Sequence, residues 1–287
     1  MIAVPEFLRD YQQRVDQELR RLVPLEGSRV QQSMAYTVHA PSKRVRAVLT
    51  LLCAELCGGS ATRAVPAAAA IELVHASSLI LDDLPTMDNA PLRRGRASNH
   101  VAFGEAIAIL AAFGLLNLAY GELSRAYDAS LSGALSALLS EAIGLDGLIG
   151  GQAEDLLATD QAITFETLER IHRGKTGALF VASASAGTLT AGAGSDQRQW
   201  LAAFAKNLGL AFQIIDDLLD VEGNPEDTGK AVRSDARKTT FVSFSGVAGA
   251  RQLALELCQT ADRALTPFGT RADRLRALSA FVAGRHA

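Results

Sequence analysis

The 287-residue chain has few cysteines, few aromatic residues and no surplus of positive charge. Its three cysteines, Cys53, Cys57 and Cys258, are too few for a disulfide framework, and no further cysteine or histidine lies close in sequence to the first two to complete a zinc site. We therefore expect buried, reduced thiols in a cytoplasmic protein. The net charge of −3 argues against a dedicated nucleic-acid binder.

Long uninterrupted hydrophobic runs are also absent. The longest, residues 106–116, contains a glycine and is about half of what a membrane crossing needs. The first six residues include a proline and a glutamate where a signal peptide would need an apolar segment. We therefore expect no membrane insertion.

Alternating strand patterns bounded by Asn-Gly or Asp-Gly turns are missing, and the helix-forming residues alanine and leucine dominate. Hydrophobic periodicity predicts helices over residues 6–23, 47–56, 66–81, 105–127, 131–148, 165–172, 179–189, 197–219, 248–265 and 271–282. Thr164 is the expected N-cap of the helix at 165–172. The sequence predicts an all-α, single-domain bundle of roughly ten or more helices over residues 1–287, with the apolar helix around 106–118 at its centre.

Two acidic clusters stand directly after apolar segments. Carboxylates crowded against apolar side chains repel one another and cost desolvation energy, so folding alone gives no reason to do this twice. Hard divalent cations would be held by such oxygen ligands, and they would in turn hold a polyanion such as a diphosphate. The candidate metal-site residues are Asp82, Asp83, Asp88, Asp216, Asp217 and Asp220.

In the second cluster, Gln213, Asp216 and Asp220 are spaced i, i+3 and i+7, so they share one helical face. Asp217 is turned about 100° away, and we expect it to support the residues of that face rather than to share it. An exposed acidic face is the alternative, but the apolar neighbours leave little room for a solvated side.

In the first cluster, Asp82 and Asp88 are six residues apart, about 120° around an ideal helix. Pro85 cannot continue a helix, because it lacks an amide proton and clashes with the carbonyl four residues back. The chain can then loop out and return Asp88 beside Asp82. A helix that simply ends at a proline is the alternative.

Basic residues follow the first cluster and recur along the chain. The adjacent Arg93 and Arg94 could neutralise the carboxylates, yet arginine is also the preferred side chain for bidentate phosphate recognition. His75 lies two turns before Asp82 on the same helical face. Together with further basic residues, they carry enough charge for two diphosphates, one on metal and one on side chains alone; these further residues are Lys43, Arg46, Lys175, Lys230 and Lys238.

The stretch 72–89, followed by Arg93-Arg94-Gly95, resembles the trans-isoprenyl diphosphate synthases. It is most similar to the bacterial, carotenoid-type geranylgeranyl diphosphate synthases, whose first aspartate motif has the same two-residue insertion. The resemblance covers essentially the whole chain. It includes residues 43–46, Gly151-Gln152 with Asp155, residues 175–177, residues 212–217 and Gly229-Lys230.

This resemblance implies a deep central cavity, a usual homodimer, and Mg²⁺-dependent condensation of isopentenyl diphosphate with an allylic diphosphate. Asp82 and Asp88, with Asp216 opposite, would hold three Mg²⁺ ions that grip the allylic diphosphate. That grip would be completed by Arg93, Lys175, Gln213 and Lys230. Isopentenyl diphosphate would be bound without metal by Lys43, Arg46, His75 and Arg94, and Thr176 would steady the allylic cation.

The length of the product is expected to depend on Ser77 and Ser78, which lie roughly 6–8 Å below Asp82 along the helix. Large aromatic residues at these positions stop chain growth early in this family, so small serines favour a C20 product. We predict that Ser77→Phe shortens the product. The floor of the cavity is expected lower down, near Phe113 or Leu116.

Farnesyl diphosphate synthase, with a C15 product, is the main alternative. A class I terpene cyclase would lack the second aspartate cluster and would not need Arg46, His75 and Arg94. An inactive synthase subunit would typically have lost one motif, and both are intact. A carboxylate di-iron bundle would need Glu-x-x-His pairs, which do not occur.

Overall fold

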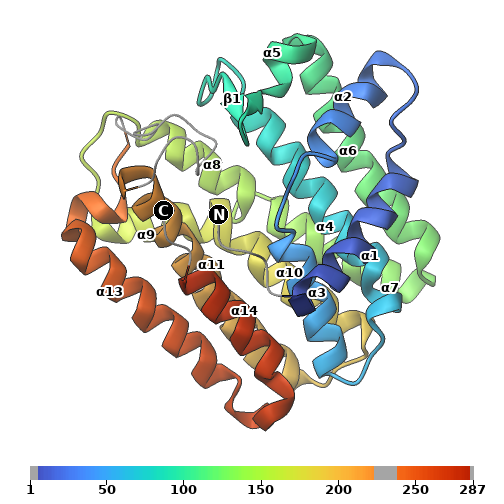
Figure 1. Ribbon diagram of the computed structural model, residues 1–287, viewed down its shortest axis with the longest axis vertical. Coiled ribbons are helices and arrows are strands. Elements are labelled where there is room, and N and C mark those ends of the chain that lie inside the picture. The colour runs from blue at the N-terminus through green and yellow to red at the C-terminus, as the bar shows by residue number, and fades with distance from the viewer. Residues whose placement is uncertain (1–5, 223–237, 285–287) are drawn as a thin grey trace.

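The computed structural model describes residues 6–222 and 238–284, which form helices and one two-strand hairpin (Figure 1). In chain order the elements are α1 (Glu6–Leu22), α2 (Arg29–Val38), α3 (Val45–Leu56), α4 (Ala61–Asp82), β1 (Leu92–Arg93), β2 (Arg96–Ala97), α5 (Asn99–Phe103), α6 (Glu105–Ala126), α7 (Ala129–Ile143), α8 (Leu148–Leu157), α9 (Phe165–His172), the π-helical η1 (Arg173–Gly177), α10 (Ala178–Thr190), α11 (Ser195–Glu222), α13 (Phe241–Ala264), the 3₁₀-helical η2 (Thr266–Ala272) and α14 (Asp273–Ala283). The predicted all-α fold is confirmed.

Most of the expected helices are present, but the helix predicted over 131–148 ends at Ile143, and α8, which starts at Leu148, was not predicted. The chain turns between α7 and α8, where the amide of Gly147 donates to the carbonyl of Gly144 at 3.0 Å. A Cβ on Gly147 would lie 2.2 Å from the carbonyl oxygen of Ala142, so only glycine fits this turn. The sequence reading also missed α2, whose Ser28–Gln31 capping box starts a helix with a weak apolar pattern.

Helices α3 and α10 form the centre of the bundle. Helix α10 packs against α3, α4, α7 and α11, and Figure 1 places it between the α4–α6 side and the α11–α13–α14 side of the molecule. Small side chains permit this close packing, since a Cβ on Gly187 of α10 would lie 2.2 Å from the carbonyl oxygen of Thr50 on α3. One connected hydrophobic cluster draws residues from α1 through to α14.

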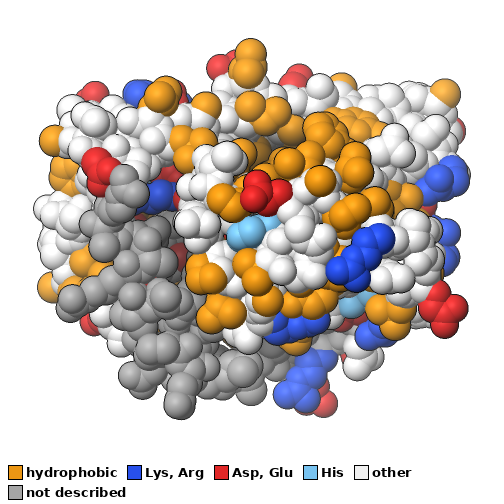
Figure 2. All heavy atoms as spheres, turned by 90° about the horizontal axis from the view of Figure 1, so that it is seen from above, with side chains coloured by type: hydrophobic (Ala, Val, Ile, Leu, Met, Phe, Trp, Pro, Cys, Tyr) orange, Lys and Arg blue, Asp and Glu red, His pale blue; other side chains and the backbone are white. Residues whose placement is uncertain are grey.

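Helix α6 is peripheral rather than central as the sequence suggested. Its apolar residues Ile109, Leu110 and Phe113 are exposed by 36%, 53% and 65%. Figure 2 looks onto the end of the molecule that carries β1 and α5, and shows hydrophobic side chains gathered across the middle of that end. The apolar composition of α6 therefore serves a surface as well as the core.

Three helical stretches are long and apolar enough to cross a membrane, judged by length and composition alone: α4, α6 and residues 129–157. The longest unbroken apolar run of the sequence, residues 106–116, lies within α6. In α4 the apolar character has a local explanation, because 67% of its most hydrophobic window is buried within the bundle. For residues 129–157 that share is 22%.

Candidate active site

The first aspartate cluster forms a loop at the end of α4. The helix ends at Asp82, and the amide of Asp88 donates to the carbonyl of Asp82 at 3.0 Å. A second bond from the amide of Ala90 to the carbonyl of Asp83, at 3.2 Å, closes the loop. The chain therefore returns Asp88 beside Asp82, as the position of Pro85 predicts.

Arg93 pairs with the carboxylate next to Asp82. It lies on β1, and the turn to β2 is made by Arg94 and Gly95, with φ values of 55° and 73°. The Nε of Arg93 donates to both oxygens of Asp83, at 2.9 and 3.1 Å, and a terminal nitrogen lies 3.4 Å from Asp82. Asp83 is buried, with 2% exposure. It therefore holds the hairpin against the end of α4, and its role as a metal ligand stays a prediction.

Two lysines bridge the remaining carboxylates of the first motif to Asp155 on α8. The Nζ of Lys175 lies 3.2 Å from Asp82 Oδ1 and 2.7 Å from Asp155 Oδ2. The Nζ of Lys238 lies 2.7 Å from Asp88 Oδ1 and 2.9 Å from the same oxygen of Asp155. The sequence analysis named Asp155 in the family resemblance and Lys238 among the basic residues, but it gave neither an individual role in the site. The available signals were the Gly-Gln-x-x-Asp stretch at 151–155 and the Lys-Thr pair at 238–239.

The electrostatics keep these groups ionised at neutral pH. Burial alone would raise the pKa of Asp82, but Lys175, Arg93 and Lys238 lower it to about 2. The pKa of Asp155 is also lowered, because the two lysines outweigh its burial. Conversely, Asp82 and Asp155 raise the pKa of Lys175 despite burial. The cluster is a set of compensated charges.

Glycines allow α8 and η1 to approach closely enough for these contacts. A Cβ on Gly151 would lie 2.2 Å from the backbone nitrogen of Lys175. Beside it, Gln152 Nε2 donates to Asp82 Oδ1 at 2.9 Å. The π-helical geometry of η1 is itself common at functional sites, and here it carries both Lys175 and Thr176.

The second aspartate cluster lies on the continuous helix α11. Gln213 accepts a hydrogen bond from the Thr176 hydroxyl at 2.9 Å, which links this helix to η1. Gln213 Nε2 donates to Asp217 Oδ1 at 3.0 Å, and the amide of Phe241 donates to Asp217 Oδ2 at 3.0 Å. Both oxygens of Asp217 thus accept hydrogen bonds from protein donors, and its role as a metal ligand stays a prediction. Asp216 and Asp220 are half-buried.

The oxygen donors fit Mg²⁺ in kind, because hard carboxylate oxygens are what this ion prefers. Asp82 and Asp88 are joined by a backbone hydrogen bond, and their carboxylates contact the ammonium groups of Lys175 and Lys238, besides the Gln152 amide at Asp82. Over residues 6–222 and 238–284, however, no three carboxylate, imidazole or thiolate side chains are grouped closely enough to hold a metal as they stand. Lys230, a predicted phosphate ligand, lies outside the described residues.

A separate cluster of positive charge surrounds His75. A terminal nitrogen of Arg46 lies 3.4 Å from His75 Nε2, and the Arg46 guanidinium stacks over Phe180 at 4.7 Å. Burial, and then the charges of Arg46, Arg94, Arg93 and Arg44, hold the pKa of His75 well below its usual value. Burial, opposed by Glu72 but reinforced by the neighbouring guanidiniums, lowers the pKa of Arg94 to about 10. Crowded, partly buried guanidiniums favour an anion among them.

The other basic residues of the 43–46 stretch have different surroundings. Lys43 lies with its Nζ 5.5 Å from the ring centroid of Phe281, at the contact with α14. Arg44 is buried and donates to Asp16 at 2.9 Å and to Glu72 at 3.4 Å, which ties α1 and α4 to the start of α3.

Residues 28–260 match the family described as polyprenyl synthetase. The chain belongs to that family. It is 41% identical over 259 residues to a farnesyl diphosphate synthase of Geobacillus stearothermophilus, covering 88% of this chain and 87% of the relative. It is 39% identical over 260 residues to a geranylgeranyl diphosphate synthase of Cyanophora paradoxa, with 88% and 87% covered.

Solved structures agree with these sequence matches. An apo FPP/GFPP synthase from Zymomonas mobilis superposes with a TM-score of 0.86 at 34% identity, covering 97% of this chain and 98% of the other. A geranyltransferase from Helicobacter pylori, complexed with magnesium and isoprenyl diphosphate, gives 0.87 at 29% identity, covering 98% and 99%. The protein is thus a trans-prenyltransferase of a family that uses Mg²⁺, and the names of its relatives include both C15 and C20 synthases.

The residues expected to set product length in this prenyltransferase fall in two groups. Ser77 is buried and donates to the carbonyl of Ala112 at 2.9 Å, so it faces α6. Ser78 is half-buried and donates to the carbonyl of His75 in its own helix at 2.8 Å. Phe113 is 65% exposed and therefore cannot be a floor inside this subunit, which corrects the expectation, whereas Leu116 packs against the core.

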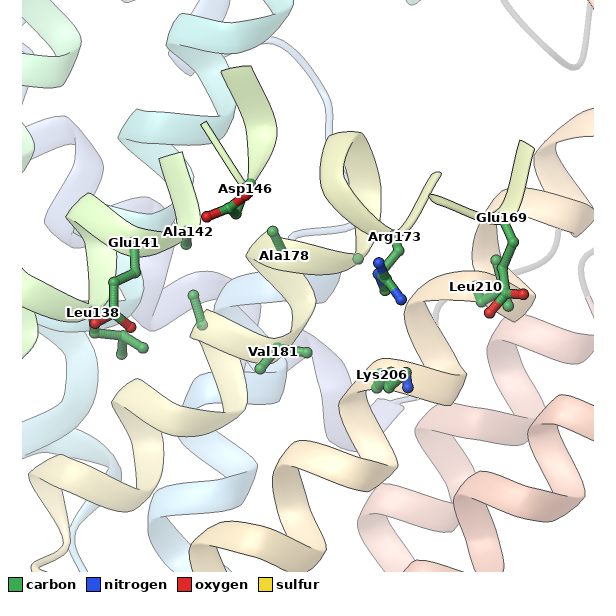
Figure 3. A pocket seen from close by; sticks show the side chains of 13 residues that line it. Leu138, Glu141, Ala142, Asp146, Glu169, Arg173, Ala178, Val181, Lys206 and Leu210 are labelled. Carbon is green, nitrogen blue, oxygen red and sulfur yellow. The ribbon is translucent and has the colours of Figure 1, made fainter. Parts of the chain in front are cut away.

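A groove of about 410 Å³ lies beside η1 (Figure 3), and Lys175 is not among the residues that line it. Its walls come from the end of α7, the turn before α8, α10 and α11, and Arg173 and Gly177 bring η1 into it. Lys206 and Asp146 lie at its rim, and the carboxylates of the two aspartate motifs are not part of it. The deep central cavity implied by the family resemblance stays a prediction.

Proposed function

We propose that this prenyltransferase condenses isopentenyl diphosphate with allylic diphosphates and makes geranylgeranyl diphosphate, C20. The observation that carries the proposal is the presence of two charge clusters of opposite character. Asp82, Asp88 and Asp155 make one of them, compensated by lysines. Arg46, Arg94 and His75 make the other, with a surplus of positive charge. Such a pair suits one diphosphate held through cations and one held by side chains.

In the proposed mechanism Asp82, Asp88, Asp216 and Asp220 would hold the Mg²⁺ ions, three in number. When bound, these ions supply positive charge that stabilises the departing allylic diphosphate. Lys175, Arg93, Gln213 and Lys230 hold the same diphosphate through side-chain nitrogens.

The remaining steps depend on positioning. Arg46, Arg94, His75 and Lys43 orient isopentenyl diphosphate so that its double bond meets the allylic cation. The Thr176 oxygen, fixed by its bond to Gln213 at 2.9 Å, steadies that cation. The apolar neighbours of both aspartate clusters exclude water, which would quench it. A proton is then lost to the departing diphosphate.

We further propose that the enzyme is a cytoplasmic homodimer. The support is the apolar surface of α6, where Ile109, Leu110 and Phe113 are exposed. Contiguous exposed apolar patches of this kind mark interaction surfaces in proteins that are not in a membrane.

Farnesyl diphosphate synthase, with a C15 product, is the second candidate. Two observations favour it: the printed name of the 41% identical relative, and the orientation of Ser77 toward α6 rather than toward an open channel. The difference between the two candidates is one further condensation in the same site.

The test is a product assay. Purified enzyme is incubated with isopentenyl and dimethylallyl diphosphates, with and without Mg²⁺, and the hydrolysed prenols are separated by length. We expect a Mg²⁺-dependent C20 alcohol, and a shift to C15 or C10 for Ser78→Phe. Phenylalanine is placed at Ser78 because at Ser77 it would collide with α6.

Thr270→Phe is the control for this assay, because Thr270 is exposed on η2 and should leave the product unchanged. A C15 product from the wild type would select the second candidate. Product that forms without Mg²⁺, or no prenol at all, would contradict the proposed reaction.

A further inference from the structure

Lys238 lies just before α13 and reaches the first aspartate motif, 150 residues away in sequence. The start of α13 is fixed on the other side by the bond from the Phe241 amide to Asp217. From there the Lys238 side chain spans to Asp88, at 2.7 Å, and to Asp155, at 2.9 Å. The proposed mechanism gives no separate step to Lys238 or to Asp155.

The ammonium of Lys238 stands where a metal ion bound to Asp88 would need to be. Asp155 and Asp88 raise the pKa of Lys238 although burial opposes them, so the group stays protonated at any ordinary pH. A divalent cation that binds Asp88 Oδ1 must therefore displace the ammonium of Lys238, which contacts that oxygen. The described chain has no preassembled group of three metal-binding side chains, which agrees with carboxylates held by internal cations.

The ion pair between Lys238 and Asp88 is easier to separate than the neighbouring ion pair between Arg93 and Asp83. Arg93 contacts both oxygens of Asp83, and the side chain of Asp83 is 3% exposed. Lys238 makes a single contact with Asp88, whose side chain is 25% exposed. A bidentate guanidinium pair fixes its geometry, whereas an ammonium is a point charge on a flexible stem. Asp88 can therefore change partner at a lower cost than Asp83.

Asp155 provides the place for the displaced ammonium. Its Oδ2 already contacts both Lys238 and Lys175, and its backbone is held by the close α8–η1 contact at Gly151. When Asp88 turns to a metal ion, Lys238 keeps one carboxylate partner. Its charge then stays within the site instead of moving into solvent.

We propose that Lys238 is an internal counterion that occupies Asp88 in the metal-free enzyme and moves onto Asp155 alone when a divalent cation binds. The inference rests on the proposed metal role of Asp88. It makes Lys238 a positioning residue that sets how tightly the enzyme takes metal before substrate arrives.

The test measures Mn²⁺ binding to the full-length enzyme without substrate, from the electron paramagnetic resonance signal of the free ion. Lys238→Gln removes the competing charge, and we expect the Mn²⁺ Kd to fall about tenfold, the size of one partly buried ion pair. Lys238→Arg keeps the charge and should bind as the wild type does. Lys238→Met, with a similar stem, is the second charge-removing variant if the glutamine variant does not fold.

Arg170→Gln is the matched control. It also removes one positive charge next to α8, from an exposed pair with Glu154 at 2.9 Å, and should change the Kd by less than twofold. An equal gain in Arg170→Gln would show a general charge effect and overturn the proposal. An unchanged Kd in both Lys238→Gln and Lys238→Met would also overturn it, while leaving the metal role of Asp88 intact.

Asp88→Asn in the Lys238→Gln background separates this inference from the proposed function. If the metal binds at Asp88, the added substitution should remove the tenfold gain. A gain that persists without the Asp88 carboxylate, or no Mn²⁺ binding by any variant, would overturn both the metal role and the counterion role.

Discussion

The two aspartate motifs look alike in sequence, yet the structure treats them differently. The first is a loop, and its carboxylates are paired with Arg93 of the adjoining hairpin and with two distant lysines, Lys175 and Lys238. The second lies on an unbroken helix, where Asp216 and Asp220 share a face with Gln213. A loop can place carboxylates that helical spacing would separate, and a helix places them only at fixed angles.

The two motifs share one feature, the burial of the second aspartate of each Asp-Asp pair. In each motif the second residue of the Asp-Asp pair, Asp83 or Asp217, is buried with 2% exposure. Asp83 holds the β1–β2 hairpin through Arg93, and Asp217 holds the start of α13 through the amide of Phe241. A cluster of aspartates in a sequence is thus a mixture of structural and functional acids. The substitutions that follow separate the two.

The largest effect is expected from Asp82→Asn. The substitution removes a carboxylate that the proposed mechanism needs to hold Mg²⁺, so kcat should fall about 10²–10³-fold, as for other losses of a group that stabilises developing charge. Steady-state assays with isopentenyl and geranyl diphosphates measure it. Glu154→Gln, an exposed acid on α8, should leave kcat unchanged. More than a tenth of wild-type activity in Asp82→Asn would contradict the assignment.

Asp217→Ala should act mainly on stability. It leaves the Phe241 amide and Gln213 Nε2 without their acceptor in a buried region, which costs about 1–3 kcal/mol. Urea unfolding should show this as a lower midpoint with an unchanged slope. Asp146→Ala, at an exposed position, should lie within about 0.5 kcal/mol of the wild type. A fully stable Asp217→Ala would mean that Asp217 does not support α13.

The smallest expected effect is on the pH dependence of the free energy of unfolding. It tests the surroundings of the second motif, where His172 packs on Phe241. His172 packs on Phe241 at 5.2 Å, and neither of its ring nitrogens has a hydrogen-bond partner among the described residues. Burial lowers its pKa to about 4. Since the unfolded chain binds this proton at pH below about 6.5 and the folded chain only near 4, stability falls as the pH drops through that window.

Between pH 7 and 5.5 this group alone should cost about 1 kcal/mol of stability. His172→Phe should remove that loss, measured by urea unfolding at the two pH values. A dependence of similar size from His75, whose pKa is held well below its usual value, should remain in the variant. Asp82, with a pKa of about 2, contributes stability that is lost only as pH falls through about 4 toward 2, so it adds nothing in this window. If His172→Phe loses as much stability between pH 7 and 5.5 as the wild type does, His172 is not a source of the pH dependence.

Much of the fold could be predicted from the sequence, because helical periodicity, caps and proline act locally. The expected Thr164 cap is present, with its side chain accepting from the amide of Thr167 at 3.2 Å, and the helix it starts has the predicted bounds. The return of Asp88 to Asp82 followed from Pro85 for the same reason. Where glycines let the chain turn sharply, as between α7 and α8, apolar periodicity carried the predicted helix past the end of α7, and α8 was not predicted.

The sequence by itself determined the helices, the two acidic clusters and which of their members share a face. Only the tertiary structure decided which carboxylate takes which cation. Asp155 joins Lys175 and Lys238, which lie 20 and 83 residues further along the chain, because Gly151 lets α8 approach η1 and because Asp217 fixes the start of α13. The reason is that hydrophobic periodicity records the angle of a side chain around its own helix, whereas an ion pair depends on the distance between helices, and that distance is set by packing.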